Sequence, residues 1–266
     1  MITKGFVLAR EKWQVLLYPA FLDLISLVFT FGVAGYSMQQ TVTYQIFAIG
    51  PSLPSINDIL AEPNELLGMN VELGVPGAGA TAGILLFLLV FIFIGIFIEA
   101  GFFHLIWQGA AGNGDISFSQ FIDGAKRFWV RFLLLYVLLI VLLIVPLILM
   151  SFFGFFGLIL VGVGVLILRV VFIYLEFTII ADDIGIFDAL GQSFAYFKQT
   201  GGEIIVLLFA MAAATALIGF IINYAALPFL VILMTPVYLF VVTGFMFALA
   251  LMLEEARRAV YPAETT

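Results

Sequence analysis

The sequence predicts an all-α, polytopic membrane protein with six transmembrane helices and three amphipathic helices at the cytoplasmic interface. Hydrophobic residues make up 64% of the 266 residues and charged residues only 10%. A soluble domain of this length could not bury so much apolar surface, so we expect lipid to cover it. Six apolar runs reach the roughly 20 residues that a helix needs to cross a bilayer. We therefore treat residues 1–266 as one integral membrane domain.

The predicted spans are separated by recognisable turns. They cover residues 14–36, 81–105, 132–152, 155–178, 203–222 and 228–252. Gly154 and Gly157 indicate a tight turn between the third and fourth spans, and residues 223–228, which end in a proline, indicate another, because Gly and Pro interrupt helices. The longest connection, the predicted outer loop 38–79, is rich in Pro and Gly. We expect one short helix in it, near residues 56–67.

The positive charges predict how the chain is threaded. Of the ten Lys and Arg residues, only Arg169 lies inside an apolar run, and the loop 38–79 has none. Short cytoplasmic flanks carry the excess of Lys and Arg in membrane proteins. We therefore predict a multi-pass protein with both termini in the cytoplasm. The first run is too long for a cleaved signal peptide and is expected to remain as an anchor.

Three segments that precede the hairpins have apolar stripes at helical spacing, which is typical of helices lying in the membrane interface. The stripes are Ile2, Phe6, Ala9 and Trp13; Phe118, Phe121, Ile122, Ala125, Phe128, Trp129 and Phe132; and Phe187, Leu190, Phe194 and Phe197. Ser117 and Gln120 have the spacing of a capping box, which predicts a helix start. The pattern suggests three units of one interfacial helix and one hairpin, over about 1–107, 115–180 and 182–253. Independent lead-in helices would give the same pattern.

Charged residues inside the predicted spans form a candidate intramembrane polar cluster of Asp23, Glu99, Arg169 and Glu176. At about 1.5 Å per residue, Asp23 and Arg169 lie at similar depth in the inner half of the membrane, so they could pair, with Glu99 beside them. One interpretation is a buried ion pair that fixes helix packing. The other is a polar path for protons or a grip on an anionic headgroup. We expect three further residues, His104, Trp129 and Phe194, at the interface.

Composition excludes several kinds of chemistry. The chain has no Cys and a single His, so thiol catalysis and Cys-rich or His-rich metal sites are excluded. No basic patch favours nucleic-acid binding, and GxSxG, HExxH and Walker motifs are absent. Asp182, Asp183 and Asp188 resemble one Asp-rich cluster of membrane prenyltransferases, but no second cluster follows, and helix capping explains them more simply. We expect no catalytic residue, no cofactor and no bound metal.

One stretch carries a family resemblance. Residues 169–202 read RVVFIYLEFTIIADDIGIFDALGQSFAYFKQTGG. A membrane helix, an acidic turn and a helix with Ala189, Leu190, Ser193, Phe194 and Tyr196 resemble the YciC-like inner-membrane proteins and the membrane domain of some glycerophosphodiester phosphodiesterases. The opening KGFVLAREKWQVLLYPAFLDL is similar in style. The resemblance implies a six-helix architecture in a prokaryotic plasma membrane and no catalytic residues. It carries no activity, because the soluble phosphodiesterase domain has no counterpart in these residues.

These observations favour a non-enzymatic role, as a scaffold or accessory subunit that acts with membrane lipids or with a protein partner. The alternative is a small transporter or channel whose path is lined by Asp23, Glu99 and Arg169. A water-accessible cavity that reaches those residues would favour the transporter, and a dry packed bundle would count against it. A third hypothesis, an intramembrane lipid enzyme, requires Asp182, Asp183 and another carboxylate to converge on one pocket.

Overall fold

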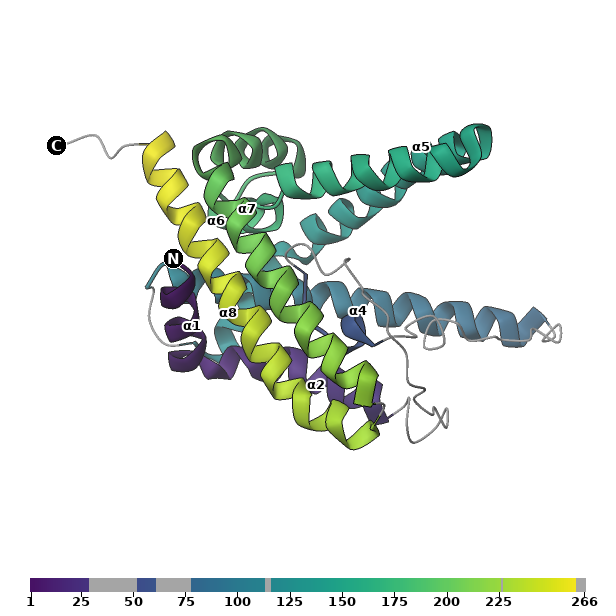
Figure 1. The fold of residues 1–266 in the computed structure, drawn as a ribbon, viewed down its shortest axis with the longest axis horizontal. Helices are drawn as coiled ribbons and strands as arrows, with labels where there is room; N and C mark the ends of the chain where they lie inside the picture. The colour runs from purple at the N-terminus through teal and green to yellow at the C-terminus, as the bar shows by residue number, and fades with distance from the viewer. Residues whose placement is uncertain (29–51, 61–77, 113–115, 226, 262–266) are drawn as a thin grey trace.

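The computed structural model describes residues 1–28, 52–60, 78–112, 116–225 and 227–261. Within these ranges the chain is almost entirely helical and has no β-strand (Figure 1). Four helical segments are long and apolar enough to cross a membrane, namely Ile92–Ala110, Ile159–Ala181, Ile186–Ala225 and Pro228–Val260. The prediction of an all-α protein is confirmed for the described residues, and these four segments indicate that it is embedded in a membrane.

The chain begins with α1 (Ile2–Glu11), the 3₁₀ helix η1 (Trp13–Leu16) and α2 (Leu17–Leu27). α1 lies against the last helix, α8 (Pro228–Val260) (Figure 1). The two backbones approach so closely at Gly5 that a Cβ there would lie 2.8 Å from the Ala248 Cβ. Next to this contact, the Phe6 and Phe245 rings meet edge to face at 5.2 Å. Small residues thus let α1 dock tightly on α8.

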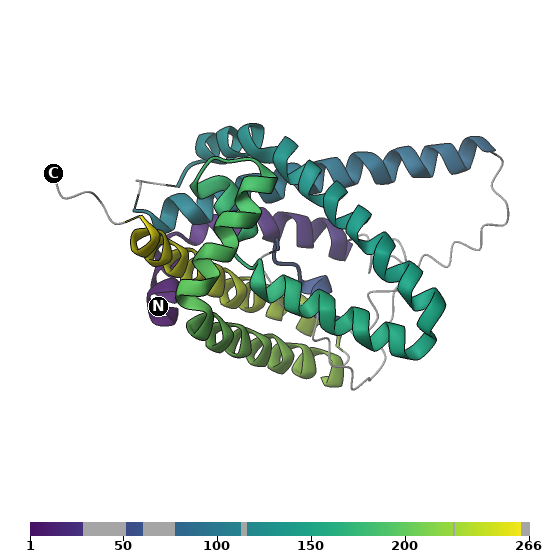
Figure 2. The ribbon, with the colours of Figure 1, turned by 90° about the horizontal axis from the view of Figure 1, so that it is seen from above.

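The next two helices are α4 (Ala78–Ala110) and α5 (Phe118–Val171). α5 begins at Ser117 with the predicted capping box, in which Ser117 Oγ accepts from the Gln120 N–H and the Gln120 side chain accepts from the Ser117 N–H. At Gly154 the backbone leaves the helix with φ 55° and ψ −129°, a left-handed conformation that suits glycine. Figure 2 shows that α5 doubles back on itself, so that its two parts form a hairpin. The predicted turn between the two parts is therefore confirmed.

The structure corrects the extent of several predicted helices. The run 155–178 is not one helix, because α5 ends at Val171 and a turn at 172–174 precedes α6 (Leu175–Ala181). The second and third predicted interfacial segments are not separate helices. The second continues unbroken into α5, and the third continues into α7 (Ile186–Ala225). Proline is a common cause of helix breaks, and neither junction contains one.

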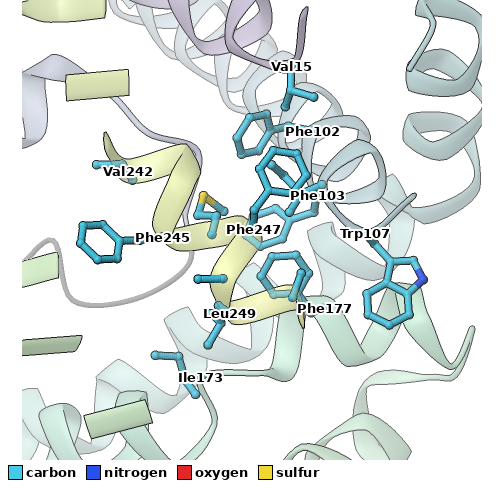
Figure 3. Packing of buried hydrophobic residues seen from close by; sticks show 14 of the residues in the cluster. Val15, Phe102, Phe103, Trp107, Ile173, Phe177, Val242, Phe245, Phe247 and Leu249 are labelled. Atoms are coloured by element: carbon cyan, nitrogen blue, oxygen red, sulfur yellow. The ribbon is translucent and has the colours of Figure 1, made fainter. Parts of the chain in front are cut away.

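The hydrophobic core lies where α4, α6 and α8 meet. Phe103 of α4 packs edge to face on Phe177 of α6, with ring centroids 4.9 Å apart, and Phe247 of α8 lies beside them (Figure 3). All three side chains are fully buried. By contrast, apolar side chains toward the far end of α5 are open, with Ile140 61% and Leu160 64% exposed. The hairpin formed by the two parts of α5 projects away from the other helices (Figures 1 and 2).

Part of the predicted outer loop 38–79 belongs to the folded structure. Residues 52–60 contain a 3₁₀ helix, η3 (Ile56–Ile59), at the start of the region where one short helix was predicted. Residues 38–51 and 61–77 lie outside the described residues. η3 packs against α7 and α8, and this placement creates the site described next.

Candidate functional site

Residues 52–60, called here the inserted segment, lie among the helices. Pro54, Ile56, Ile59 and Leu60 are all buried. The helical residues that bond to the segment include Asp23, ten residues into the first apolar run, and Tyr238, ten residues into α8. At about 1.5 Å per residue, Tyr238 lies about 15 Å past the start of α8, well inside that helix. Irregular backbone at such depth requires partners inside the protein for its polar groups.

Asp23 of α2 provides the first of these partners. Its Oδ1 accepts a hydrogen bond from Ser55 Oγ at 2.6 Å, and its Oδ2 accepts one from the Ile56 N–H at 2.9 Å. The Asp23 side chain is buried, and both of its oxygens are used. Because the first N–H groups of a helix have no partner within it, Asp23 caps η3 from a different part of the chain.

Other side chains complete the hydrogen bonds of the inserted segment. Asp58 accepts from the Ser55 N–H at 3.2 Å, and the Tyr238 hydroxyl donates to Asp58. At the other end of η3, Asn223 Nδ2 of α7 donates to the Ile59 carbonyl at 2.9 Å. Helices α2, α7 and α8 therefore all bond to this short segment. We call Asp23, Ser55, Asp58 and Tyr238 the Asp23 cluster.

A second group of polar side chains, called here the Glu99 cluster, comprises Glu99 of α4, Tyr136 and Arg169 of α5, and Glu176 of α6. The Tyr136 hydroxyl donates to Glu99 Oε2, and the Leu53 N–H of the inserted segment also bonds to Glu99. Arg169 Nη1 donates to Glu176 Oε1 at 2.5 Å. The charges of Arg169 and Glu176 both act on Glu99. Glu176 Oε2 is buried and has no hydrogen-bond partner.

The four residues of the predicted polar cluster thus fall into two groups. Glu99, Arg169 and Glu176 lie together, whereas Asp23 bonds to the inserted segment. Similar depth allowed an Asp23–Arg169 pair, but in the described part of the chain Asp23 instead directs both oxygens at residues 55–56. The inserted segment nevertheless joins the two groups, since Leu53 bonds to one and Ser55 to the other.

Sequence reasoning missed several residues of this site, namely Ser55, Asp58, Tyr136, Asn223 and Tyr238. Ser55 and Asp58 have capping-box spacing, which could have indicated the start of η3. A Tyr in an apolar run gives no such signal, because its ring suits either lipid or the core.

Two adjacent aspartates tie helices together at the other end of the molecule. Asp183 has φ 54° and accepts from Arg127 Nη2 at 2.5 Å and Arg131 Nη1 at 2.6 Å. The hydrogen bonds from Arg127 and Arg131 lower the pKa of the Asp183 carboxyl below its ordinary value of 3.8. Asp182 instead accepts from Arg257 Nε at 2.8 Å and from the Tyr196 hydroxyl at 2.9 Å. The two carboxylates serve different partners, and the described residues contain no group of three His, Asp or Glu that could hold a metal.

The predicted interfacial residues occupy varied settings. His104 packs against Gly124 and lies 5.7 Å from the Phe128 ring. Trp129 is partly buried. Phe194 is 41% exposed and carries the Lys198 ammonium 4.3 Å from its ring centroid.

An apolar groove of about 610 Å³ lies between the start of the chain and helices α4 and α5. Its lining is Gln14, Leu17, Tyr18, Phe21, Ile98, Ile116, Phe118 and Phe121. The Tyr18 and Phe121 rings stack at 4.0 Å on one wall, while Leu17 and Phe21 are 53% and 61% exposed. None of the charged residues of the two clusters lines this groove.

We compared the chain with protein-family models, with curated proteins and with solved structures, and none of them matches.

Proposed function

We propose that this chain is a non-enzymatic integral membrane protein of the prokaryotic plasma membrane, a scaffold or accessory subunit that acts with membrane lipids. We further propose six transmembrane helices, three interfacial segments and cytoplasmic termini. The absence of Lys and Arg from residues 38–79 supports this orientation, as does the position of Arg127, Arg131 and Arg257 in ion pairs outside the middle of the apolar runs. The resemblance to YciC-like proteins agrees with this architecture.

The apolar groove is the observation that carries the proposal. Its volume of about 610 Å³ lies within the range of about 300–1,000 Å³ that small-molecule sites occupy. Its lining is aliphatic and aromatic apart from Gln14 and the Tyr18 hydroxyl, which suits an acyl chain. Leu17 and Phe21 are more than half exposed, so the groove is open at these two residues. Trp13, half-exposed just before the groove, is a residue type enriched at the bilayer interface.

The test is native mass spectrometry of the full chain, extracted gently with its own lipids. We expect a stoichiometric phospholipid on the wild-type protein. Leu17→Trp, which adds bulk to the groove, should lose it. Leu24→Trp is the matched control, because Leu24 is on the same helix and 59% exposed but does not line the groove. Equal lipid retention by both variants would contradict the proposed lipid site, and a co-purifying protein would point to a partner instead.

A transporter or channel is the second candidate, and the inserted segment favours it. Broken backbone buried between spanning helices, with carboxylates bonded to it, is a common arrangement at ion and substrate sites of transporters. Asp23 holds that segment through two hydrogen bonds. The discriminating measurement is ion and solute flux into liposomes that contain the purified chain. Flux above that of empty liposomes, lost in a folded Asp23→Asn variant, would favour transport over the scaffold.

A further inference from the structure

The Glu99 cluster is unbalanced in charge. Glu99 and Glu176 provide two carboxylates, and Arg169 supplies the one positive charge that the described residues place beside them. Glu99 is 7% exposed and Glu176 is 5% exposed, so solvent does not stabilise the negative charge of either carboxylate. An uncompensated charge in such a low-dielectric setting is strongly unfavourable. The cluster therefore lacks one unit of positive charge.

The hydrogen bonds show where that charge is missing. Glu99 accepts from the Tyr136 hydroxyl and the Leu53 N–H. Glu176 Oε1 accepts from Arg169, whereas Glu176 Oε2 is buried with no donor. Buried polar atoms almost always have a partner, and an exception calls for an unseen proton, ion or water. The charge count and the unpartnered oxygen are independent observations: the first shows that the cluster lacks a positive charge, and the second places an unsatisfied acceptor at Glu176.

We propose that the Glu99 cluster is a binding site for one small monovalent cation, either a proton or Na⁺, centred on Glu176 Oε2. The charged and polar side chains of the site come from three helices, with Glu99 on α4, Tyr136 and Arg169 on α5, and Glu176 on α6. The Leu53 N–H of the inserted segment bonds to Glu99. The bound cation makes the cluster neutral, so the Arg169–Glu176 ion pair and Glu99 can coexist away from water. The site is independent of the lipid groove, and it would serve either a packing role or a transport role.

The same count argues against an anionic ligand at Arg169. Its guanidinium already donates to Glu176 at 2.5 Å and feels the charge of Glu99. A phosphate headgroup placed there would add a third negative charge to one positive charge. The anionic-headgroup interpretation of Arg169 is therefore disfavoured by its neighbours.

The experiment uses the full chain in lipid nanodiscs. Its first readout is the thermal unfolding midpoint in NaCl and in choline chloride of equal ionic strength, across a pH series. The second is the infrared carbonyl band of a protonated carboxyl group. The variants are Glu176→Gln and Glu99→Gln, each of which removes one negative charge and keeps the side-chain shape. Glu203→Gln, at an exposed position on α7, is the matched control for the same chemical change.

Two results would support the proposal and identify the cation. If it is Na⁺, the wild-type midpoint rises with Na⁺ but not with choline, because a ligand that binds only the folded state stabilises it. If it is a proton, the wild type shows the protonated-carboxyl band and no specific response to Na⁺. In either case the signal, which is the Na⁺-dependent rise of the midpoint or the protonated-carboxyl band, is lost in Glu176→Gln or Glu99→Gln and kept in Glu203→Gln. A wild type with neither response, or responses that survive in both cluster variants, would overturn the proposal.

Discussion

Asp23 and Ile56 are joined by a hydrogen bond of 2.9 Å between a carboxylate oxygen and a backbone N–H, although they belong to different segments separated by 33 positions. The carboxylate does for η3 what an N-cap residue ordinarily does for its own helix. Helix α2 thereby fixes the position of a connecting segment. This relationship makes the inserted segment a structural part of the bundle, and it leads to the first prediction.

Asp23→Ala should destabilise the protein because it removes two hydrogen bonds and leaves the Ile56 N–H buried without a partner. We expect a loss of about 2–4 kcal/mol, combining a lost cap with an unsatisfied buried group. Ser55→Ala, which removes only one donor, should cost about 1 kcal/mol. Ser52→Ala is the control, since Ser52 is exposed in the same segment. Denaturant unfolding in mixed micelles gives the three values, and an Asp23→Ala variant as stable as the Ser52→Ala control would refute the capping role.

Gly5→Ala should weaken the contact between α1 and α8. A Cβ at Gly5 would come within 2.6 Å of the Ala248 N and 2.8 Å of the Ala248 Cβ, so the helices must separate. Overpacking of this kind costs about 1–3 kcal/mol. Gly191→Ala is the matched change, because nothing lies within 4 Å of a Cβ there. It should be neutral or stabilising by up to about 1 kcal/mol. Thermal unfolding of both variants checks the difference, and equal midpoints would contradict the close approach.

The ion pairs of Asp183 predict a dependence on acid and salt. The pKa of the Asp183 carboxyl is lower in the folded protein than its ordinary value of 3.8, chiefly because Arg127 and Arg131 donate to it. A group whose pKa is lowered on folding contributes stability above its unfolded pKa and loses it as pH falls through the folded value. The contribution should therefore be complete at pH 7 and disappear below about pH 4.

The exposed position of Asp183 keeps the expected effect small. Asp183 is 42% exposed, so its pairs should contribute about 0.2–1 kcal/mol and weaken in high salt. Asp183→Asn should lose this contribution without backbone strain, because Asn tolerates the left-handed conformation seen at φ 54°. Asp183→Ala should cost more than Asp183→Asn. The unfolding midpoints of the wild type and both variants, measured against pH and salt, test this order. If the midpoint of Asp183→Asn still falls with acid as steeply as that of the wild type, the predicted contribution of the Asp183 ion pairs is contradicted.

The proposed six-span topology can be tested directly, because the chain contains no cysteine. Single cysteines at Ser119, Phe153 and Leu227 occupy exposed positions at three helix ends or turns. Six spans with cytoplasmic termini require labelling of Ser119→Cys from inside, and of Phe153→Cys and Leu227→Cys from outside, by a membrane-impermeant maleimide on intact cells and inverted vesicles. Labelling of Phe153→Cys from inside would mean that the α5 hairpin does not cross the membrane.

The sequence predicted the features that depend on local chemistry. The capping box at Ser117, the break at Gly154 and the helix beginning at Pro228 all follow from the conformational preferences of single residues, and the structure confirms them. The turn at 172–174 was missed because no Gly or Pro precedes it. The continuity of α5 and α7 was missed because a stripe predicts a helix but not where it ends.

The candidate site was harder to predict, since it depends on tertiary position. Helix depth placed Asp23 and Arg169 at a similar level, with Glu99 beside them, whereas the structure groups Glu99 with Arg169 and Glu176. Depth alone could not show that residues 52–60 enter the bundle, because this Pro-containing loop has no periodic pattern. Without that segment, Asp23 had no evident partner except Arg169.

The bond between Asn223 and the Ile59 carbonyl also bears on how the protein assembles during synthesis. Asn223 follows Ile59 by 164 residues. At about 5–20 residues per second, a ribosome needs roughly 8–33 s to travel that distance. During this interval α7 does not yet exist, so the inserted segment cannot reach its final set of bonds. The inserted segment must therefore remain incompletely bonded until α7 has been made.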